Sequence, residues 1–528
     1  MGEWMAWMFK EDESSRDVEN RIDSLFKSQG FFQGANVQAG NHYGIAMLAS
    51  PVMATGYADG VYVTVLGHLD NRKALHAGLG LGSSTELSES ELVGKSYRRW
   101  GAGAVKRVYG ANGVVLWDRV RQQLVVGADC SGYYPVYWTV IPQGIVLSSS
   151  AQILYETQSG LTNRGMERTA VGRWLQGQLG EFETILSGIH RLPEGTAIIV
   201  DHETWINDIP ASTTSVDPIP SRRRFAIDAL EDKLTQSIRS QGQHPVPANQ
   251  GFWADGTTHS LLLAAMAVRE GVADGPLYVS HDYGQQPFLT GAQLAAKHLG
   301  LKIVEVDSGW QPGAVEWAIA TLPEPYAAST LFRILPLLAN WPRAEGHLWI
   351  ASGHETLFPI DKRQTASSLA AFERGGHAWT AREIGLMGAL AEARGMTIKA
   401  PFASSDIRTW LKQFPPTWHR DRWNKPSVWS QLAHRYLPPA AIRLALPPAM
   451  LMLNEPMRAW AGDILSSQEM RDRGVWKMSA LWEYFHSLTE ADPVHPGFMN
   501  VLVAERWMQQ RASQSSGLRE KERRYARG

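Results

Sequence analysis

Residues 251–265, which read GFWADGTTHSLLLAA, place a short run of small and polar residues between an apolar segment and a run of helix formers. Leu261 to Met266 favour a helix by intrinsic propensity. A strand, a small-residue turn and a helix N-terminus in this order direct free backbone N–H groups and the positive end of the helix dipole toward an anion. The sequence therefore predicts a phosphate-binding loop, with the cofactor-binding candidates Asp255, Gly256, Thr257, Thr258, His259 and Ser260.

The elements after this loop alternate between strand and helix. The strands Leu277–His281 and Lys302–Val306 are predicted on either side of a helix at Leu289–Leu299, and this rhythm predicts a parallel, doubly wound sheet. Ligands of such sheets bind beyond the carboxyl ends of the strands. Ser352–Glu355 also follows a predicted strand, so the carboxylates of Glu355 and Asp255 are candidate metal ligands, with His354 beside Glu355.

The first 200 residues have a different pattern, because short β-rich segments dominate. Strands are predicted at Val61–Leu69, Gly113–Trp117, Leu124–Ala128, Val136–Val140, Gly144–Ser148 and Ala197–Val200. Helices are predicted at Glu89–Trp100, capped by Ser88, and at Ala170–Gln178. Residues 206–222 are rich in Pro, Ser and Thr and read as a linker. The predicted units are thus 1–205, the linker 206–222, a second domain at 223–510 and a polar tail at 511–528.

Composition narrows the functional classes. The 528 residues carry a formal net charge of −1, which gives no reason to expect a nucleic-acid partner. Cys130 is the only cysteine, so a disulfide framework and a multi-cysteine metal site are excluded. No apolar run reaches the roughly 18 residues of a membrane span, and the first residues lack a signal-peptide pattern. We therefore expect a soluble, cytoplasmic protein.

Several segments of the first half resemble the N-terminal domain of asparagine synthetases and their relatives. They are Gly67–Arg72, Tyr97–Gly101, Val115–Asp118, Gly127–Asp129, Gly132–Tyr137 and Gly188–Gly195. The second half resembles the synthetase domain of the same family, which includes β-lactam synthetases and lasso-peptide cyclases. The resemblance implies an Ntn-hydrolase-like αββα sandwich followed by an adenine-nucleotide α-hydrolase-like domain. It also implies ATP and Mg²⁺ as cofactors, and a peptide or small-molecule carboxylate that is activated as an acyl adenylate and attacked by an amine.

The chain departs from this family at the positions that carry its chemistry. Gly2 stands where glutamine-hydrolysing members have a nucleophilic cysteine, so glutaminase activity is not expected. The family's pyrophosphate loop reads Ser-Gly-Gly-x-Asp-Ser-Ser, and only Gly256 and Ser260 match it. Thr258 replaces a metal-binding carboxylate, while Asp255 brings a new negative charge to the turn. A like charge about 4 Å from a phosphate costs roughly 1 to 4 kcal/mol.

Further substitutions follow downstream. Glu355 replaces a metal-binding Asp and keeps an oxygen ligand, and Ser404 replaces another Asp. Ala445 stands where the family places a lysine that stabilises the acyl-transfer transition state, and the loss of such a cation costs several kcal/mol of barrier. Lys425 and Arg443 are the candidate catalytic replacements for that lysine.

Two functions are compatible with these residues. The first is a divergent ATP-dependent, AMP-forming carbon–nitrogen ligase without glutaminase activity, which tailors a peptide in the manner of a lasso cyclase or acts on a specialised metabolite. The second is a pseudoenzyme that needs no cofactor and serves as a scaffold for a peptide or a partner biosynthetic protein. On this reading, the loss of the family's catalytic residues is one pattern rather than four separate coincidences, and it affects Gly2, Thr258, Ser404 and Ala445.

Overall fold

A computed structural model gives the structure of the chain. It describes residues 3–9, 36–39, 43–47, 53–58, 60–82, 86–108, 110, 112–142, 144–158, 165–176, 178–201, 207–209, 218–242, 249–255, 257–280, 286–306, 311–326, 328–341, 345–352, 381–404, 407, 410–411, 413–415, 418, 427–442, 453–490, 492 and 494–525. Among these residues, no helix is both long and apolar enough to cross a membrane.

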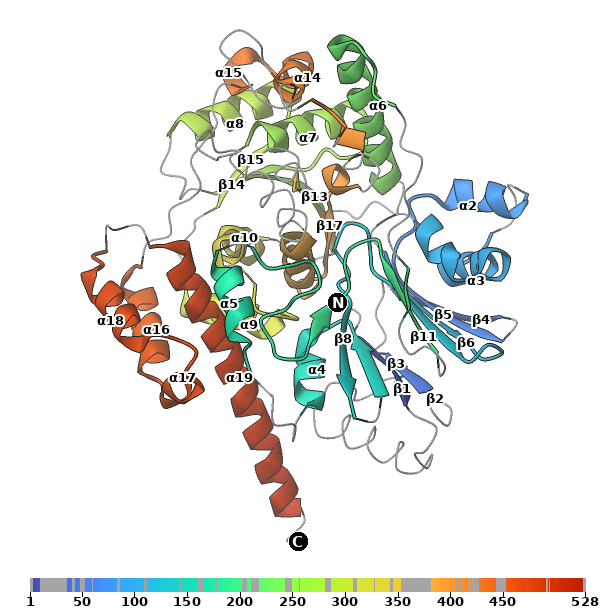
Figure 1. Cartoon of the computed structure of the whole chain (residues 1–528). Coiled ribbons are helices and arrows are strands. Elements are labelled where there is room, and N and C mark those ends of the chain that lie inside the picture. Colours follow the sequence, from blue (N-terminus) through green and yellow to red (C-terminus); the bar gives the residue numbers. More distant parts are fainter. Residues whose placement is uncertain are drawn as a thin grey trace.

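Two antiparallel six-stranded sheets form the first half (Figure 1). One has the order β10-β8-β9-β1-β3-β2, with β1 at Trp4–Phe9, β2 at Asn36–Ala39, β3 at Tyr43–Met47, β8 at Tyr137–Ile141, β9 at Gly144–Ser148 and β10 at His190–Arg191. The other has the order β12-β11-β7-β6-β5-β4, with β4 at Met53–Ala58, β5 at Val61–Gly67, β6 at Asn112–Asp118, β7 at Gln123–Gly127, β11 at Ala197–Val200 and β12 at Asn207–Ile209.

Helices cover the outer faces of these sheets. Helices α2 (Arg72–Leu79) and α3 (Glu89–Trp100) lie on the second sheet, followed by the 3-10 turn η1 (Gly101–Arg107), while α4 (Ala151–Thr157) packs on β8 and β9. Helix α5 spans Arg168–Leu175. Trp7 of the first sheet and Val115 of the second belong to one hydrophobic core between the sheets. The layer order is thus helix, sheet, sheet, helix, as predicted. Ser88 caps α3 in a complete capping box, which confirms its predicted start.

The second half contains a five-stranded parallel sheet of order β15-β14-β13-β16-β17. Its strands are β13 (Asn249–Ala254), β14 (Leu277–Ser280), β15 (Ile303–Val306), β16 (Gly346–Trp349) and β17 (Met396–Lys399), and every pairing is parallel. The alternation of strand and helix therefore predicted the sheet correctly.

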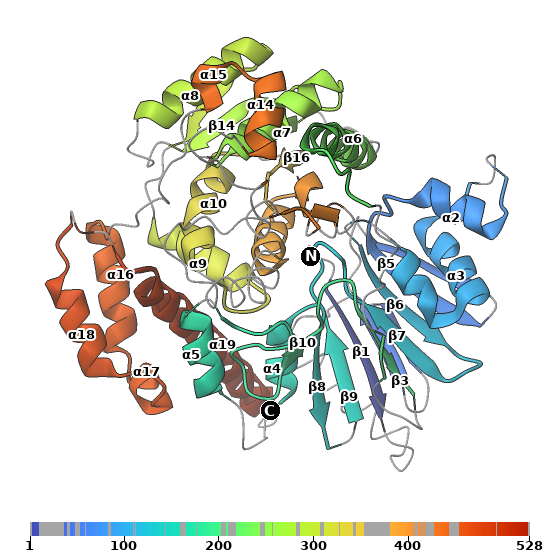
Figure 2. The same cartoon turned by 45° about the horizontal axis from the view of Figure 1, so that its top comes forward.

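Helices cover both faces of this sheet, as its two-sided burial requires. One face packs against α6 (Arg223–Gly242), α7 (Thr258–Arg269), α8 (Gln286–Leu299) and α14 (Val428–Tyr436). The other face packs against α9 (Pro312–Thr321), α10 (Ala328–Asn340) and the helical residues 381–392. Figure 2 shows α9 and α10 between the sheet and the first half.

The chain ends in a group of helices beside the long helix α19 (Figures 1 and 2). This group consists of α16 (Glu455–Ser466), α17 (Gln468–Arg473), α18 (Met478–Ser487) and α19 (Pro496–Tyr525). The short elements η4 (Pro401–Ala403) and α15 (Pro439–Ile442) lie instead with the helices of the parallel sheet, η4 against α6 and α15 against α8 and α14. The segment predicted as a polar tail from residue 511 is helical as far as Tyr525, and Arg511 is buried. The charged segment extends the same helix whose earlier turns are buried, and there Trp507 packs against Tyr155 of α4.

Candidate functional site

The predicted anion loop lies between β13 and α7, at the carboxyl end of a central strand of the parallel sheet. Thr257 is the N-cap of α7, and its hydroxyl oxygen accepts a hydrogen bond from the backbone N–H of Ser260 at 3.3 Å. The Ser260 hydroxyl donates in turn to the Thr257 carbonyl at 2.8 Å. The strand–turn–helix geometry predicted from the sequence is therefore present.

The carboxylate of Asp255 is bonded inside this loop. Asp255 is only 5% exposed. Its Oδ1 accepts hydrogen bonds from the Thr257 backbone N–H at 2.9 Å and from the Thr257 hydroxyl at 2.7 Å. A free backbone N–H at a helix start is what binds a phosphate. Here the N–H groups of Thr257 and Ser260 already have acceptors within the loop.

Neighbouring elements pack against the start of α7. The Thr258 hydroxyl donates to the carbonyl of Ile442 in α15 at 3.2 Å. The His259 ring meets the indole of Trp429 edge to face, with ring centroids 5.0 Å apart. Trp429 is buried and also packs against Phe402. Aromatic side chains thus line the side of the loop that faces α14 and α15.

The other predicted site residues fall outside the described residues. They are Gly2, Gly256, His354, Glu355, Lys425, Arg443 and Ala445. Ser352 is described and buried just after β16, at the same end of the sheet as the loop. Ser404 follows η4. Within the part of the chain that the structure describes, no group of three or more His, Cys, Asp or Glu side chains has the geometry of a metal site.

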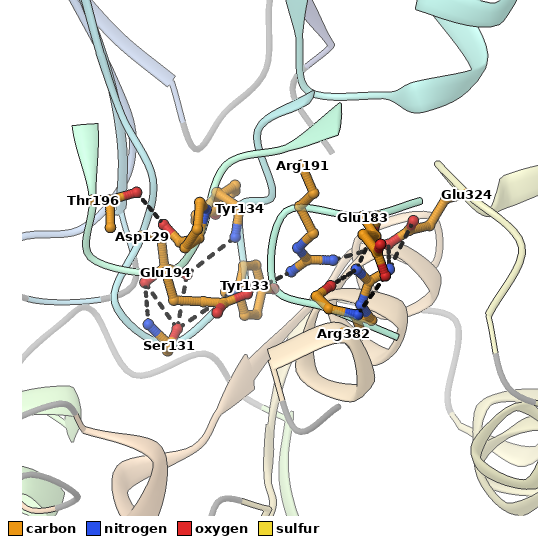
Figure 3. A network of polar contacts seen from close by, with 12 residues as sticks. Asp129, Ser131, Tyr133, Tyr134, Glu183, Arg191, Glu194, Thr196, Glu324 and Arg382 are labelled. Atoms are coloured by element: carbon orange, nitrogen blue, oxygen red, sulfur yellow. Dashed lines mark hydrogen bonds and ion pairs between the residues drawn. The ribbon is translucent and has the colours of Figure 1, made fainter. Parts of the chain in front are cut away.

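A buried ionic network joins the two halves of the chain (Figure 3). Glu324, which precedes α10, is 2% exposed and accepts hydrogen bonds from two arginines. Arg191 of β10 donates Nη1 at 2.9 Å, and Arg382 donates Nη1 to the two carboxylate oxygens at 3.2 and 3.1 Å. Arg191 also pairs with Glu194 at 3.0 Å. Both guanidinium groups are nearly fully buried, and Glu324 is the carboxylate that they share, while Glu194 compensates part of the charge of Arg191.

A tight turn beside this network contacts the helical residues 381–392. Asp129 accepts hydrogen bonds from the backbone N–H groups of Ser131 at 2.7 Å and Tyr134 at 3.1 Å. Burial nevertheless raises the pKa of Asp129 to about 6, against the effect of these hydrogen bonds. Gly132 has φ +84°, and a Cβ there would lie 2.6 Å from the Ala381 Cα. Only glycine fits this contact between the halves.

The sequence contained part of this network without revealing its role. Arg191 and Glu194 belong to the segment Gly188–Gly195, and Gly132 belongs to Gly132–Tyr137, both of which carry the family resemblance. Glu324 and Arg382 lie in no recognised motif. The only available signal was a charged residue within an otherwise apolar stretch, as at Glu324 in LPEPYAA.

Comparison with known families matches residues 52–208 to a glutamine amidotransferase domain. The chain carries a glutamine amidotransferase-type domain. This match agrees with the predicted Ntn-like nature of the first half, and it does not extend to the second half. No curated protein matches the chain.

Two solved structures show weak similarity to the chain. Glutamine phosphoribosylpyrophosphate amidotransferase from B. subtilis, complexed with ADP and GMP, is 12% identical with a TM-score of 0.28, and the match covers 71% of this chain and 89% of that one. The allosteric regulatory enzyme of purine biosynthesis is 10% identical with a TM-score of 0.28, with 76% and 80% covered. Similarity at this level does not define a shared overall fold.

Proposed function

We propose that this chain is a non-catalytic amidotransferase-type protein, whose second half no longer holds ATP and which serves as a scaffold for a peptide or a partner protein. The observation that carries the proposal is the position of the Asp255 carboxylate, which is hydrogen-bonded to Thr257 at the start of α7. A phosphate at this helix terminus would compete for the same donors and would lie close to a buried negative charge. At about 4 Å that repulsion costs roughly 1 to 4 kcal/mol.

The single cysteine supports the absence of glutamine hydrolysis. An Ntn glutaminase uses the thiol of an amino-terminal cysteine as nucleophile and its own α-amine as base. Cys130 lies in the interior of the sequence, after β7, and its sulfur is 3.3 Å from the position of a Cβ at Gly195. Its α-nitrogen belongs to a peptide bond and has no basic lone pair to offer.

Aromatic side chains at the C-terminal helices supply a surface for a partner in this proposal. On α18, Trp482 is partly buried and stacks on the exposed ring of His486, with centroids 5.3 Å apart. Aromatic residues are enriched in the buried centres of protein interfaces, so the Trp482–His486 pair suits contact with an apolar segment of a partner better than contact with water.

Isothermal titration calorimetry with ATP–Mg²⁺ and with inorganic pyrophosphate tests the proposal on the full chain. We expect no heat of binding for the unchanged protein at millimolar ligand. The matched variant is Asp255→Asn, which keeps an oxygen acceptor for the Thr257 N–H and removes the charge. If the charge excludes phosphate, this variant binds pyrophosphate more tightly than the parent. Micromolar binding of ATP–Mg²⁺ by the unchanged protein refutes the proposal.

The divergent amide-forming ligase is the second candidate. It is favoured by the retained geometry, in which the 12-residue helix α7 begins at the carboxyl end of β13. In that case Asp255, His259 and Glu355 are reworked ligands of the nucleotide and the metal. The purified protein, mixed with ATP, Mg²⁺ and a peptide that bears both a free carboxylate and an amine, then releases pyrophosphate. The scaffold proposal expects no release above the rate without protein.

A further inference from the structure

The two halves also meet at the edge strand β17, where the Ile398 N–H donates a hydrogen bond to the Tyr133 hydroxyl at 3.4 Å. Basic side chains from both halves lie near this strand. The parallel sheet contributes His347 of β16 and Lys399 of β17. In the register of these strands, His347 pairs with Thr397 and Trp349 pairs with Lys399. Because side chains alternate along a strand, His347 and Lys399 project from the same face of the sheet. Lys399 is 5% exposed.

The first half contributes the segment that follows β5, which carries His68, Asp70 and Arg72. The Ser240 hydroxyl of α6 donates a hydrogen bond to the Asp70 carbonyl at 3.1 Å, so this segment lies against the second half. Its own half also holds it, since the Asn112 amide donates to the His68 carbonyl at 3.5 Å. The segment is therefore positioned from both sides.

Each of the cations at this contact has a carboxylate close to it. Arg72 is paired with Glu89 of α3 at 2.7 Å. On α6, Arg239 next to Ser240 pairs with Glu270 at 2.6 Å. The negative charge of Asp70 stabilises the protonated form of Lys399 and so raises its pKa.

Burial and mutual repulsion lower the basicity of these groups. Burial lowers the pKa of His68 to about 4, and the charges of Lys399 and Arg72 add to that effect. Burial lowers the pKa of His347 to about 3, with further contributions from Lys399 and His68. Burial also lowers the pKa of Lys399 to about 8, although Asp70 opposes this shift. Both imidazoles are therefore neutral in the closed contact at neutral pH.

We propose that the cluster of His68, Asp70, His347 and Lys399 is a proton-sensitive junction between the two halves, which loosens when the solution is acidified. Both histidines are half-buried in the closed form. Opening exposes each imidazole fully to water, where it binds a proton below its ordinary pKa of 6.5. The contribution of the two imidazoles to the stability of the closed form is thus fully present above pH 6.5 and is lost as the pH falls toward 4. Lys399 contributes in a separate pH range: the closed form becomes more stable as the pH rises from about 8 to 10.5.

Hydrogen exchange of the full chain, read by mass spectrometry and corrected for intrinsic exchange rates, tests this junction at pH 7 and pH 5. The reporter amides are those of residues 67–71 and of β17, and the reference is the β6–β7 pair inside the first half. From the pKa changes above, the open population rises by up to about 20-fold per imidazole between these two pH values. We expect the reporters to lose protection while the reference keeps it.

Three proteins are compared with the parent. The pair His68→Gln with His347→Gln removes both proton acceptors and is expected to abolish the response. The control His298→Gln changes an exposed histidine of α8 and is expected to retain it. His347→Gln alone, which tests the idea if the pair does not fold, is expected to halve the response on a logarithmic scale. The proposal is overturned by equal protection at both pH values, by a response that survives in the pair, or by parallel loss in β6–β7.

Discussion

Removal of the carboxylate of Glu324 should weaken the coupling between the two halves of the chain, so that they unfold less cooperatively. Arg191 belongs to the first half, Arg382 belongs to the second, and Glu324 accepts from both within 2.9 to 3.2 Å. In Glu324→Ala both guanidiniums stay in the interior, because Arg191 is 1% and Arg382 is 5% exposed. Arginine cannot escape the cost by losing its proton, since it is protonated at every accessible pH.

The magnitude follows from what each arginine keeps. Arg191 retains Glu194 at 3.0 Å, and Arg382 retains the carbonyls of Gly180, at 3.3 Å, and of Glu183. Breaking a buried pair by removing one partner costs about 3 to 5 kcal/mol, and we expect Glu324→Ala to fall in that range. Glu324→Gln keeps the shape and one acceptor oxygen. Its loss should be smaller, about 1 to 3 kcal/mol, the cost of an unsatisfied buried group.

Urea unfolding followed by tryptophan fluorescence and by far-UV circular dichroism measures these losses. A chain of two halves need not unfold in one step, so the number of transitions is itself a result. We expect Glu324→Ala to move the first transition to lower urea and to separate it from the second. Glu490→Gln, at an exposed position, is the control. A loss below about 1 kcal/mol for Glu324→Ala, matching the control, would refute a coupled junction.

Three further changes test other contacts. Asp255→Ala leaves the Thr257 N–H without its acceptor and should cost about 0.5 to 2 kcal/mol in urea unfolding; an unchanged midpoint would contradict the bonded loop. Gly132→Ala places a methyl group 2.6 Å from the Ala381 Cα at φ +84° and should cost more than about 2 kcal/mol; wild-type stability would show that the two halves do not meet there. Glu505→Gln removes a fully buried carboxylate from two donors of the C-terminal helices and should lower the thermal midpoint by several degrees, whereas an unchanged midpoint in calorimetry would contradict a role in their packing.

Local patterns in the sequence predicted local structure well. Ser88 and Glu91 form a capping box that depends on four consecutive residues, and α3 begins where that pattern places it. The loop at 254–260 needed only one strand, one turn and one helix. The contact of Arg191 with Glu324 spans 133 positions in the chain, and no local pattern encodes it. The roles predicted for Glu355, Lys425 and Arg443 stay predictions.

Asp255 shows a further reason why residue types alone do not settle a site. In the sequence it was a candidate ligand for a cation, because a carboxylate at the end of a parallel strand suits a metal. In the structure the same oxygen accepts two hydrogen bonds from Thr257. A carboxylate at a helix N-terminus is stabilised by the dipole, so the position satisfies the helix without any ligand. The residue type is compatible with either role, and in this structure the position of the carboxylate lets it bond to Thr257.

The halves share one apolar core, and the two ionic contacts between them differ in how they respond to protons. The Glu324 network relies on arginines, which stay charged across the whole range in which the imidazoles titrate. The contact around Lys399 contains two half-buried histidines whose pKa values lie below 6.5 while the contact is closed. Acid therefore weakens one junction and leaves the charged donors of the other in place. If acid loosens the contact between the halves, the β17 edge should open first, while the Glu324 network and the shared apolar core hold. Glu324→Ala should then extend the loss of protection at low pH from the β17 edge to the residues around Arg382.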